Sequence, residues 1–304
     1  MRLPHVVESQ QFTVPLLMEL FARTREMEKV VARGGTRDYS SKVMASLFYE
    51  PSTRTRFSSE AAMYRLGGRV MSTEHARIFS SEIEGEQLED TIRIISSYSD
   101  VIVLRHTEEG GARRAARVSR VPVVNAGDGG GGQHPTQALL DLYTIHRERR
   151  SLEGLSIAIV GELDRGRTTR SLAYLLSKFD RVKIYFVAPQ EVQMRQDILD
   201  HLDEHDVWYD LSSDVSPIAG QVDVIYQTRI RPDRVEDRAA LERYTIDGRL
   251  LGRMKSDAMI LHPLPRTVEI DKAVDDDPRA LYFKQATNGL FIRMALLTLL
   301  WDHD

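Results

Sequence analysis

The chain has 304 residues, of which 42% are hydrophobic and 28% charged, a composition typical of a globular protein large enough for two domains. Its 41 lysines and arginines nearly balance its 45 aspartates and glutamates without forming a long basic patch, so nucleic acid is not expected as a partner. No apolar run reaches the roughly 18 residues that cross a bilayer, and cysteine is absent, so we expect a cytoplasmic protein without disulfides, thiolate metal sites or membrane contact.

The first half of the chain alternates between helical and extended hydrophobic patterns. Apolar residues recur every three or four positions in the predicted helices at 12–32, 55–66, 86–98 and 110–118. Short β-rich runs bounded by turn residues predict strands at 42–50, 67–73, 100–106 and 121–127. This alternation is the signature of an α/β fold, with a mostly parallel sheet covered by helices on both faces.

A glycine run, GDGGGGQHP at 127–135, interrupts the alternation and predicts a loop at a domain boundary. Pro135 suits the first turn of the helix that follows it, at 136–150. The alternation then resumes with strands expected at 155–161, 182–188, 223–228 and 258–264, and helices at 166–179, 191–204 and 237–245. An amphipathic helix is expected at 288–302. We therefore predict two doubly wound parallel-sheet domains, 1–133 and 134–286, and a C-terminal helix in 287–304 that packs back on the first.

The segment FYEPSTRTRF, at 48–57, carries the strongest chemical signal. A strand ends near Glu50, and Pro51 turns the chain. The residues where the next helix begins are Ser52, Thr53, Arg54 and Thr55. Free backbone N–H groups at a helix start, hydroxyls and a guanidinium together suit a phosphate group. An N-cap flanked by surface arginines is the simpler alternative, but the interleaved hydroxyl and guanidinium groups favour a phosphate site.

Polar residues at other strand and loop ends extend this site. His134 can donate to a carbonyl oxygen that gains charge and Gln137 can hold an amino group, although a single histidine at a helix entrance is also a common cap. Because ligands of open α/β sheets bind outside the carboxyl ends of strands, we expect three arginines to converge there: Arg105, Arg167 and Arg229.

The remaining motifs bear on cofactors. The segment HPLPR, at 262–266, ends another strand and offers backbone carbonyls to an amine, or is simply a strand terminator. The segment GELDRGRT after the strand at 155–161 lacks the G-x-G-x-x-G spacing of a dinucleotide site, and neither an H-E-x-x-H motif nor a Walker loop is present. The sequence therefore predicts an anion-rich substrate site without a metal or a cofactor.

Taken together, these motifs resemble the aspartate/ornithine carbamoyltransferase family. STRTR at 52–56, HPTQALLDLYTI at 134–145 and HPLPR at 262–266 carry the resemblance, which extends over nearly the whole chain. It is closer to the aspartate branch, because the ornithine branch usually has a cysteine in the last two stretches. The resemblance implies a carbamoyl-phosphate domain, an amino-acid domain and a homotrimer whose active sites are shared between neighbouring subunits. It leaves regulatory or pathway partner chains open.

The resemblance also implies a reaction and its residues: a carbamoyl group passes from carbamoyl phosphate to the amino group of an amino acid, in first place L-aspartate. Carbamoyl phosphate would be bound by Ser52, Thr53, Arg54, Thr55, Ser80, Arg105, His134 and Gln137. Of these, the implied catalytic residues, which stabilise developing charge or hold the carbamoyl group, are Arg54, Thr55, Arg105, His134 and Gln137. The acceptor would be bound by Arg167, Arg229, Arg231, Leu264, Pro265 and Glu84. Glu50 and Arg234 match a pair that stabilises a closed state.

Two positions depart from the family pattern. Glu84 stands where the family usually has a lysine, and Arg231 stands where it usually has a glutamine that contacts the acceptor. A carboxylate about 4 Å from another anion costs about 4 kcal/mol at an effective dielectric constant near 20, so Glu84 cannot simply replace the lysine. Three hypotheses follow. Glu84 and Arg231 pair, with Arg231 supplying the lost cation to aspartate; the acceptor is a different, cationic or diamino acid; or the chain is a catalytically silent homologue with a binding role.

Overall fold

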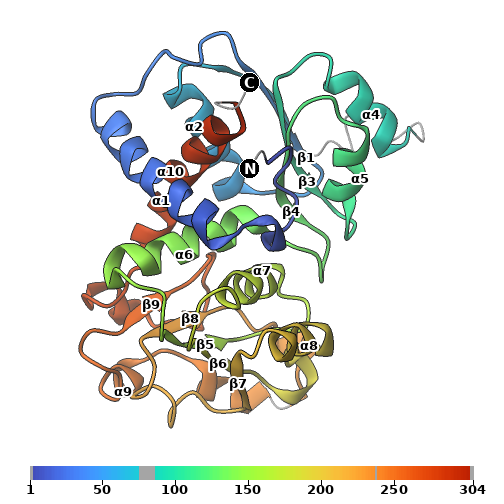
Figure 1. Ribbon diagram of the computed structural model, residues 1–304. Coiled ribbons are helices and arrows are strands. Elements are labelled where there is room, and N and C mark those ends of the chain that lie inside the picture. The colour runs from blue at the N-terminus through green and yellow to red at the C-terminus, as the bar shows by residue number, and fades with distance from the viewer. Residues whose placement is uncertain (1–2, 75–85, 237, 302–304) are drawn as a thin grey trace. The chain divides into compact units, whose positions relative to one another are not determined.

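The computed structural model describes residues 3–74, 86–236 and 238–301 (Figure 1). The chain forms two compact units, Met1–Leu140 with Thr287–Asp304, and Asp141–Ala286. None of the described helices combines the length and the apolar character that a membrane crossing requires.

The first unit is built on a four-stranded parallel sheet. Its strands are β1 (Val43–Phe48), β2 (Arg69–Glu74), β3 (Val101–His106) and β4 (Val123–Asp128). They lie in the order β2-β1-β3-β4, so the chain adds β2 on one side of β1 and then crosses to the other side for β3 and β4. The strand order therefore reverses between β1 and β3, the place where doubly wound sheets bind their ligands.

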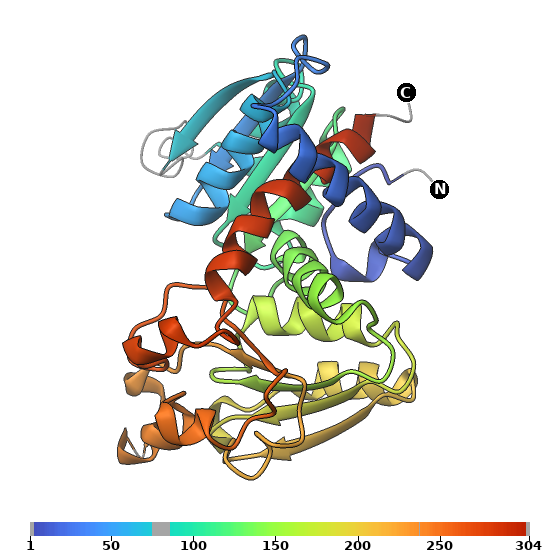
Figure 2. The same ribbon diagram turned by 90° about the vertical axis from the view of Figure 1, so that its left-hand side faces the viewer.

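Helices cover both faces of this sheet, because successive side chains of a strand point to opposite faces. On one face Ala45 and Leu47 pack in a core with Leu88 and Ile92 of α4 (Leu88–Ile95). The opposite face, from which Met44 projects, is lined by residues of α2 (Thr53–Arg65) and α10 (Tyr282–Trp301). The remaining helices of this unit are η1 (Ser9–Gln11), α1 (Val14–Ala32) and α5 (Gly111–Val118). Helices α1 and α10 run side by side in both views (Figures 1 and 2).

The second unit repeats the plan with five parallel strands in the order β7-β6-β5-β8-β9. The strands are β5 (Ser156–Val160), β6 (Lys183–Val187), β7 (Trp208–Ser212), β8 (Val224–Gln227) and β9 (Met259–Leu261). The helices are α7 (Arg167–Leu176), α8 (Gln196–Glu204), α9 (Gly248–Leu251) and the short η3 (Gln190–Val192), η4 (Pro232–Arg234), η5 (Arg238–Tyr244) and η6 (Lys272–Asp276). Helix α6 (Pro135–Arg149) runs from the first unit into the second. Here the strand order reverses between β5 and β8.

The predicted α/β class with two doubly wound parallel sheets is confirmed, and individual elements differ in detail. Strand β7 has no counterpart among the predicted strands, because it lies at the sheet edge and its side chains are exposed or half-buried, which leaves no apolar signal. The helix expected at 237–245 is wrong in type, since η5 is a 3-10 helix. Helix α10 begins at Tyr282, six residues before the expected start at 288, because the polar residues Lys284, Gln285 and Thr287 interrupt the apolar pattern after its first two residues.

Candidate active site

Arg105 lies where the strand order of the first sheet reverses. It is paired with Phe48 across β3 and β1, which brings its guanidinium to the loop that follows β1. Its Nε donates to Glu50 Oε2 at 3.3 Å, and its Nη1 lies 3.5 Å from Ser52 Oγ and 3.4 Å from the Ala126 carbonyl oxygen. The side chain is only 14% exposed. Arg105 is therefore a half-buried cation at the start of α2.

The start of α2 adds further hydrogen-bond donors. Ser52 is the N-cap residue in an extended conformation, and among the described residues its side chain caps no backbone N–H of the helix. The first N–H groups of a helix have no partner within the helix, and they attract anions. Arg54 is exposed on this first turn. Next to it, buried Thr55 places its Oγ1 3.4 Å from Nε2 of buried His134. A guanidinium, free N–H groups, a hydroxyl and an imidazole thus meet at one strand end.

The second unit has its own cluster where β5 and β8 end side by side. Val160 pairs with Gln227, and beyond this pair the Glu162 N–H donates to the Arg229 carbonyl oxygen at 3.2 Å. Gly161, with φ +132°, makes this close approach possible, since a Cβ there would lie 2.1 Å from Thr228 Oγ1. The residues after β5 and after β8 therefore lie against each other.

Glu162 is the centre of an ion-pair network in this cluster. Arg231 grips both of its carboxylate oxygens, with Nε at 3.1 Å from Oε2 and Nη2 at 2.9 Å from Oε1. Arg234 donates to Glu162 Oε1 at 2.7 Å and to Asp164 Oδ2 at 2.6 Å. Burial alone would raise the pKa of Glu162, but the hydrogen bonds and charge of Arg231 and the charge of Arg234 outweigh it and lower that pKa. Glu162 is therefore ionised at neutral pH.

Two other arginines of the second unit, Arg229 and Arg167, are not bonded through their side chains to Glu162 or Asp164 in the ion-pair network described above. Arg229 follows β8, is exposed, and makes no side-chain hydrogen bond or ion pair with any residue that the structure describes. Arg167 is the first residue of α7 and is half-buried. A guanidinium such as that of Arg229 is available for a carboxylate ligand.

The HPLPR segment after β9 is held by a buried pair. The Leu264 N–H donates to His262 Nδ1 at 2.7 Å, so the proton of the neutral ring lies on Nε2, which donates to Glu269 Oε1 at 3.0 Å. The Thr267 N–H and hydroxyl donate to the other oxygen, Oε2. Burial alone would raise the pKa of Glu269, but these hydrogen bonds outweigh it and lower the pKa to about 2. The turn at Leu264 and Pro265, whose connecting peptide bond is cis, is thus tied to an ionised carboxylate.

The predicted site residues therefore form two groups. The group in the first unit consists of Ser52, Thr53, Arg54, Thr55, Arg105, His134 and Gln137, and the group in the second consists of Arg167, Arg229, Arg231, Leu264 and Pro265. Ser80 and Glu84 lie outside the described residues, so the expected pairing of Glu84 with Arg231 stays a prediction.

Three acidic residues of the second group were not among the predicted site residues: Glu162, Asp164 and Glu269. The sequence does carry a signal for Glu162 and Asp164, because GELD at 161–164 directly follows β5 and carboxylates at a strand end can hold the arginines expected there.

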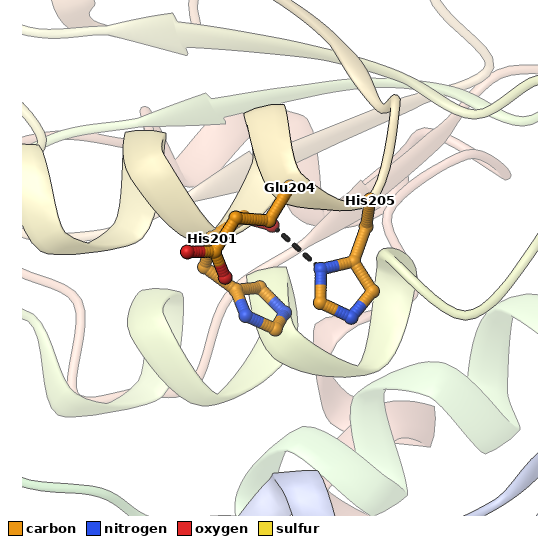
Figure 3. A group of neighbouring side chains, drawn as sticks. All are labelled: His201, Glu204 and His205. Atoms are coloured by element: carbon orange, nitrogen blue, oxygen red, sulfur yellow. Dashed lines mark hydrogen bonds between the residues drawn. The ribbon is translucent and has the colours of Figure 1, made fainter.

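A further polar group, His201, Glu204 and His205, lies at the C-terminal end of α8 (Figure 3). Their potential metal-ligand atoms lie within 4.8 Å of one another. However, His205 Nδ1 lies 2.8 Å from the His201 carbonyl oxygen, and His201 Nε2 lies 3.0 Å from Ser177 Oγ. A carbonyl only accepts, so His205 Nδ1 carries a proton and caps a free carbonyl at the helix end. This group is accounted for by the helix terminus and is separate from the candidate site.

Comparisons with known proteins find two family matches along the chain. Residues 4–147 match the family model "Aspartate/ornithine carbamoyltransferase, carbamoyl-P binding domain", and residues 153–300 match the corresponding "Asp/Orn binding domain". A chloroplastic aspartate carbamoyltransferase of Arabidopsis thaliana is 55% identical over 98% of this chain and 78% of its own length. The aspartate carbamoyltransferase catalytic subunit of Thermoplasma acidophilum is 46% identical over 96% of both chains.

Solved structures give the same result. The catalytic subunit of M. jannaschii aspartate transcarbamoylase superposes with a TM-score of 0.92 at 42% identity, covering 99% of both chains. Aspartate transcarbamoylase from Trypanosoma cruzi, in complex with carbamoyl phosphate and aspartate, superposes with a TM-score of 0.92 at 37% identity, covering 97% of this chain and 95% of that one.

Proposed function

Because the chain belongs to the aspartate/ornithine carbamoyltransferase family, we propose that it transfers the carbamoyl group of carbamoyl phosphate to the amino group of L-aspartate. The products are N-carbamoyl-L-aspartate and phosphate, which places the reaction in pyrimidine biosynthesis. The observation that carries the proposal is the arrangement of Arg105, the start of α2 and the Thr55–His134 contact at the strand-order reversal of the first sheet.

Carbamoyl phosphate is bound by the first unit in this proposal. The free N–H groups at the start of α2 and the guanidinium groups of Arg54 and Arg105 bind the phosphate oxygens. Glu50 holds Arg105 through its Nε and leaves Nη1 directed toward Ser52 and Ala126. The arginine is thus oriented before the substrate arrives, which reduces the entropy lost on binding.

The chemical step requires charge stabilisation rather than a covalent intermediate. The deprotonated amine of the acceptor attacks the carbamoyl carbon and forms a C–N bond, and the carbonyl oxygen gains negative charge. His134, Thr55 and Arg105 donate hydrogen bonds to that oxygen, and Gln137 holds the carbamoyl NH₂ group. The C–O bond to the phosphate then breaks, and its electron pair leaves with the phosphate, whose charge Arg54 and Arg105 neutralise. The proton that the attacking nitrogen loses passes to an oxygen of the departing phosphate.

The acceptor is bound by residues of the second unit. A dicarboxylic amino acid needs two cationic partners, and Arg229, which has no protein partner in the described part of the chain, offers one, while Arg167 at the start of α7 offers the other. The carbonyl oxygens of Leu264 and Pro265 accept from the carbamoyl group or the attacking amine, in a turn that His262 and Glu269 hold in place.

A second candidate function is carbamoyl transfer to a cationic or diamino acid. The observation that favours it is the two-point contact between Arg231 and Glu162, which already compensates the charge of Arg231 within the protein. Arg231 therefore adds little net positive charge to attract aspartate, while Glu84 adds a negative charge to the sequence segment that contains it. A catalytically silent homologue is the third reading.

A panel assay separates these readings. The protein is incubated with carbamoyl phosphate and one of several amines, namely aspartate, ornithine, lysine and 2,3-diaminopropionate, and the carbamoylated product is quantified. Turnover with aspartate supports the proposal, and turnover confined to diamino acids supports the second candidate. Absence of turnover, together with calorimetric binding of carbamoyl phosphate, would indicate a silent homologue. Failure of carbamoyl phosphate to bind would overturn all three.

The assembly and the location of the protein are part of the proposal. We expect a homotrimer in which the segment containing Ser80 and Glu84 contributes to a neighbouring active site, so a monomeric form is nearly inactive. Light scattering and activity measured on the same dilution series test this expectation. We also propose a cytoplasmic location, which rests on the composition and the absence of cysteine and is tested by cell fractionation.

A further inference from the structure

A chain of buried polar contacts leads from α10 to His134 within the first unit. Nη2 of Arg293 donates to Thr136 Oγ1 at 3.4 Å, Thr136 Oγ1 lies 3.4 Å from His134 Nδ1, and His134 Nε2 lies 3.4 Å from Thr55 Oγ1. The exposed fractions are 6% for Arg293, 2% for Thr136, 4% for His134 and 7% for Thr55. The three distances are long for hydrogen bonds, so each contact contributes little energy. The sequence of donors and acceptors along these contacts nevertheless determines which atoms carry protons.

The proton positions follow from which groups can only donate. An arginine has five donors and no acceptor, so the Thr136 oxygen accepts from Arg293. The Thr136 hydroxyl hydrogen then needs an acceptor. Within residues 3–74, 86–236 and 238–301, the Thr136 hydroxyl group contacts only Arg293 and His134 Nδ1, so His134 Nδ1 is the available acceptor. Leaving a buried hydroxyl hydrogen without a partner costs roughly 1–3 kcal/mol. The arrangement therefore favours a His134 whose Nδ1 accepts and whose Nε2 carries the proton.

The position of Arg293 is itself supported by Gly289, one turn earlier in α10. A Cβ at position 289 would lie 2.6 Å from Arg293 Nη1, which donates to the Gly289 carbonyl oxygen at 3.0 Å. A glycine inside a helix costs about 1 kcal/mol relative to alanine. The helix thus contains an intrinsically unfavourable residue, Gly289, where the guanidinium of Arg293 lies against its backbone.

From these contacts we infer that Arg293 and Thr136 are positioning residues that hold His134 as the tautomer with its proton on Nε2. That nitrogen faces Thr55, on the side where the carbamoyl oxygen gains charge in the proposed reaction. The inference deepens the proposed function and rests on it for its catalytic consequence. The tautomer is a property of the protein alone, so it is measured without turnover.

The first experiment reads the tautomer directly. The full chain is labelled with ¹⁵N-histidine, and long-range ¹H–¹⁵N spectra are recorded at neutral pH. The resonances of His134 are those lost in His134→Asn. We expect an unprotonated Nδ1 and a protonated Nε2. Thr136→Val, which removes the hydroxyl, is expected to shift the signals toward the other tautomer, and Thr136→Ser, which keeps it, is expected to retain the original spectrum. A proton on Nδ1 in the natural protein, or a spectrum unaltered by Thr136→Val, would overturn the inference.

Two further variants distinguish a specific effect on His134 from a general loss of structure. Gly289→Ala removes no polar group but places a methyl group against Arg293, so it is expected to shift the tautomer as Thr136→Val does. Thr298→Val removes a buried hydroxyl of α10, which donates to the Ala295 carbonyl oxygen and, in the described part of the chain, has no contact with His134. It is expected to leave the His134 signals unchanged. A tautomer shift in Thr298→Val would indicate a nonspecific loosening of the helix. It would refute the inference that Arg293 and Thr136 specifically set the tautomer of His134.

The second experiment reads catalysis. Loss of one oxyanion donor lowers kcat by about 10²–10³-fold, so a misoriented donor in Thr136→Val is expected to lower kcat by about tenfold, with KM for the acceptor within about twofold. Thr136→Ser restores kcat. An unchanged kcat in a variant whose tautomer has shifted would overturn the catalytic consequence. If no acceptor is turned over at all, the proposed function fails while the spectra still decide whether Arg293 and Thr136 position His134.

Discussion

Replacing Glu269 by glutamine tests how the HPLPR turn is held. The pKa of Glu269 is about 2 in the folded protein against an ordinary 4.5, a difference of about 2.5 that corresponds to about 3 kcal/mol of stability at neutral pH. The Glu269 side chain is only 7% exposed, so solvent screens little of this interaction. A glutamine keeps an acceptor for His262, but its NH₂ group cannot accept from Thr267. We therefore expect Glu269→Gln to lower the free energy of unfolding by about 2–3 kcal/mol.

The assay can be confined to the second unit, because the chain has two tryptophans and only Trp208 belongs to that unit. In a Trp301→Phe background, urea unfolding followed by fluorescence reports on Trp208. Asp257→Asn, at an exposed carboxylate of the same unit, is the matched control and is expected to change stability by less than about 0.5 kcal/mol.

The pH dependence gives a second readout with a definite sign. A carboxyl whose folded pKa is depressed stabilises the protein above its unfolded pKa and stops doing so as the pH falls through the folded value. The stability difference between the parent and Glu269→Gln should therefore be constant above about pH 5.5 and shrink between pH 4.5 and about 2. A loss no larger than that of the control, or a difference that persists undiminished at pH 3, would refute the reasoning.

Three other substitutions test the remaining interactions. Arg105→Lys keeps the charge but loses the forked geometry toward Ser52, so calorimetry should show carbamoyl phosphate binding weakened by about 100-fold; unchanged affinity would remove Arg105 from the phosphate site. Arg231→Gln leaves Glu162 undercompensated, so KM for aspartate should rise about tenfold, whereas a fall would point to a cationic acceptor. Asp141→Asn weakens the buried contact from the Tyr226 hydroxyl at 2.7 Å, and thermal denaturation should show a loss of about 2–3 kcal/mol; a negligible loss would contradict this estimate.

The sequence allowed the strands around the site to be predicted better than the contacts within it. Strands β1 and β3 are buried apolar runs, so the sequence predicts both strands and places Arg105 at the carboxyl end of β3. The contact of Arg105 with Glu50, which follows β1, is not among the predicted ones. Strand β7 could not be found in this way, because an exposed edge strand needs no apolar pattern.

The contacts that could not be predicted join residues far apart in the chain. Glu162 and Arg231 are 69 positions apart, and Thr136 and Arg293 are 157 apart. Hydrophobic periodicity describes only which face of an element is buried, so it contains no information on which charged side chain a strand-end carboxylate will meet. Arg293 is the only charged residue in the apolar segment FIRMALL at 291–297, so the sequence marks it as unusual. The sequence does not indicate that Thr136 is its partner.

The return of α10 to the first unit has a consequence for how the protein is made. The second unit is a continuous stretch, Asp141–Ala286, and can complete its sheet while the ribosome is still adding residues beyond Ala286. The first unit is translated first but lacks one covering helix until Thr287 and the residues after it have emerged. Its sheet face around Met44 therefore stays only partly covered, by α2, until α10 arrives. The unit whose synthesis begins first is thus the last to complete its core, and its exposed apolar surface makes the nascent chain prone to aggregation in this interval.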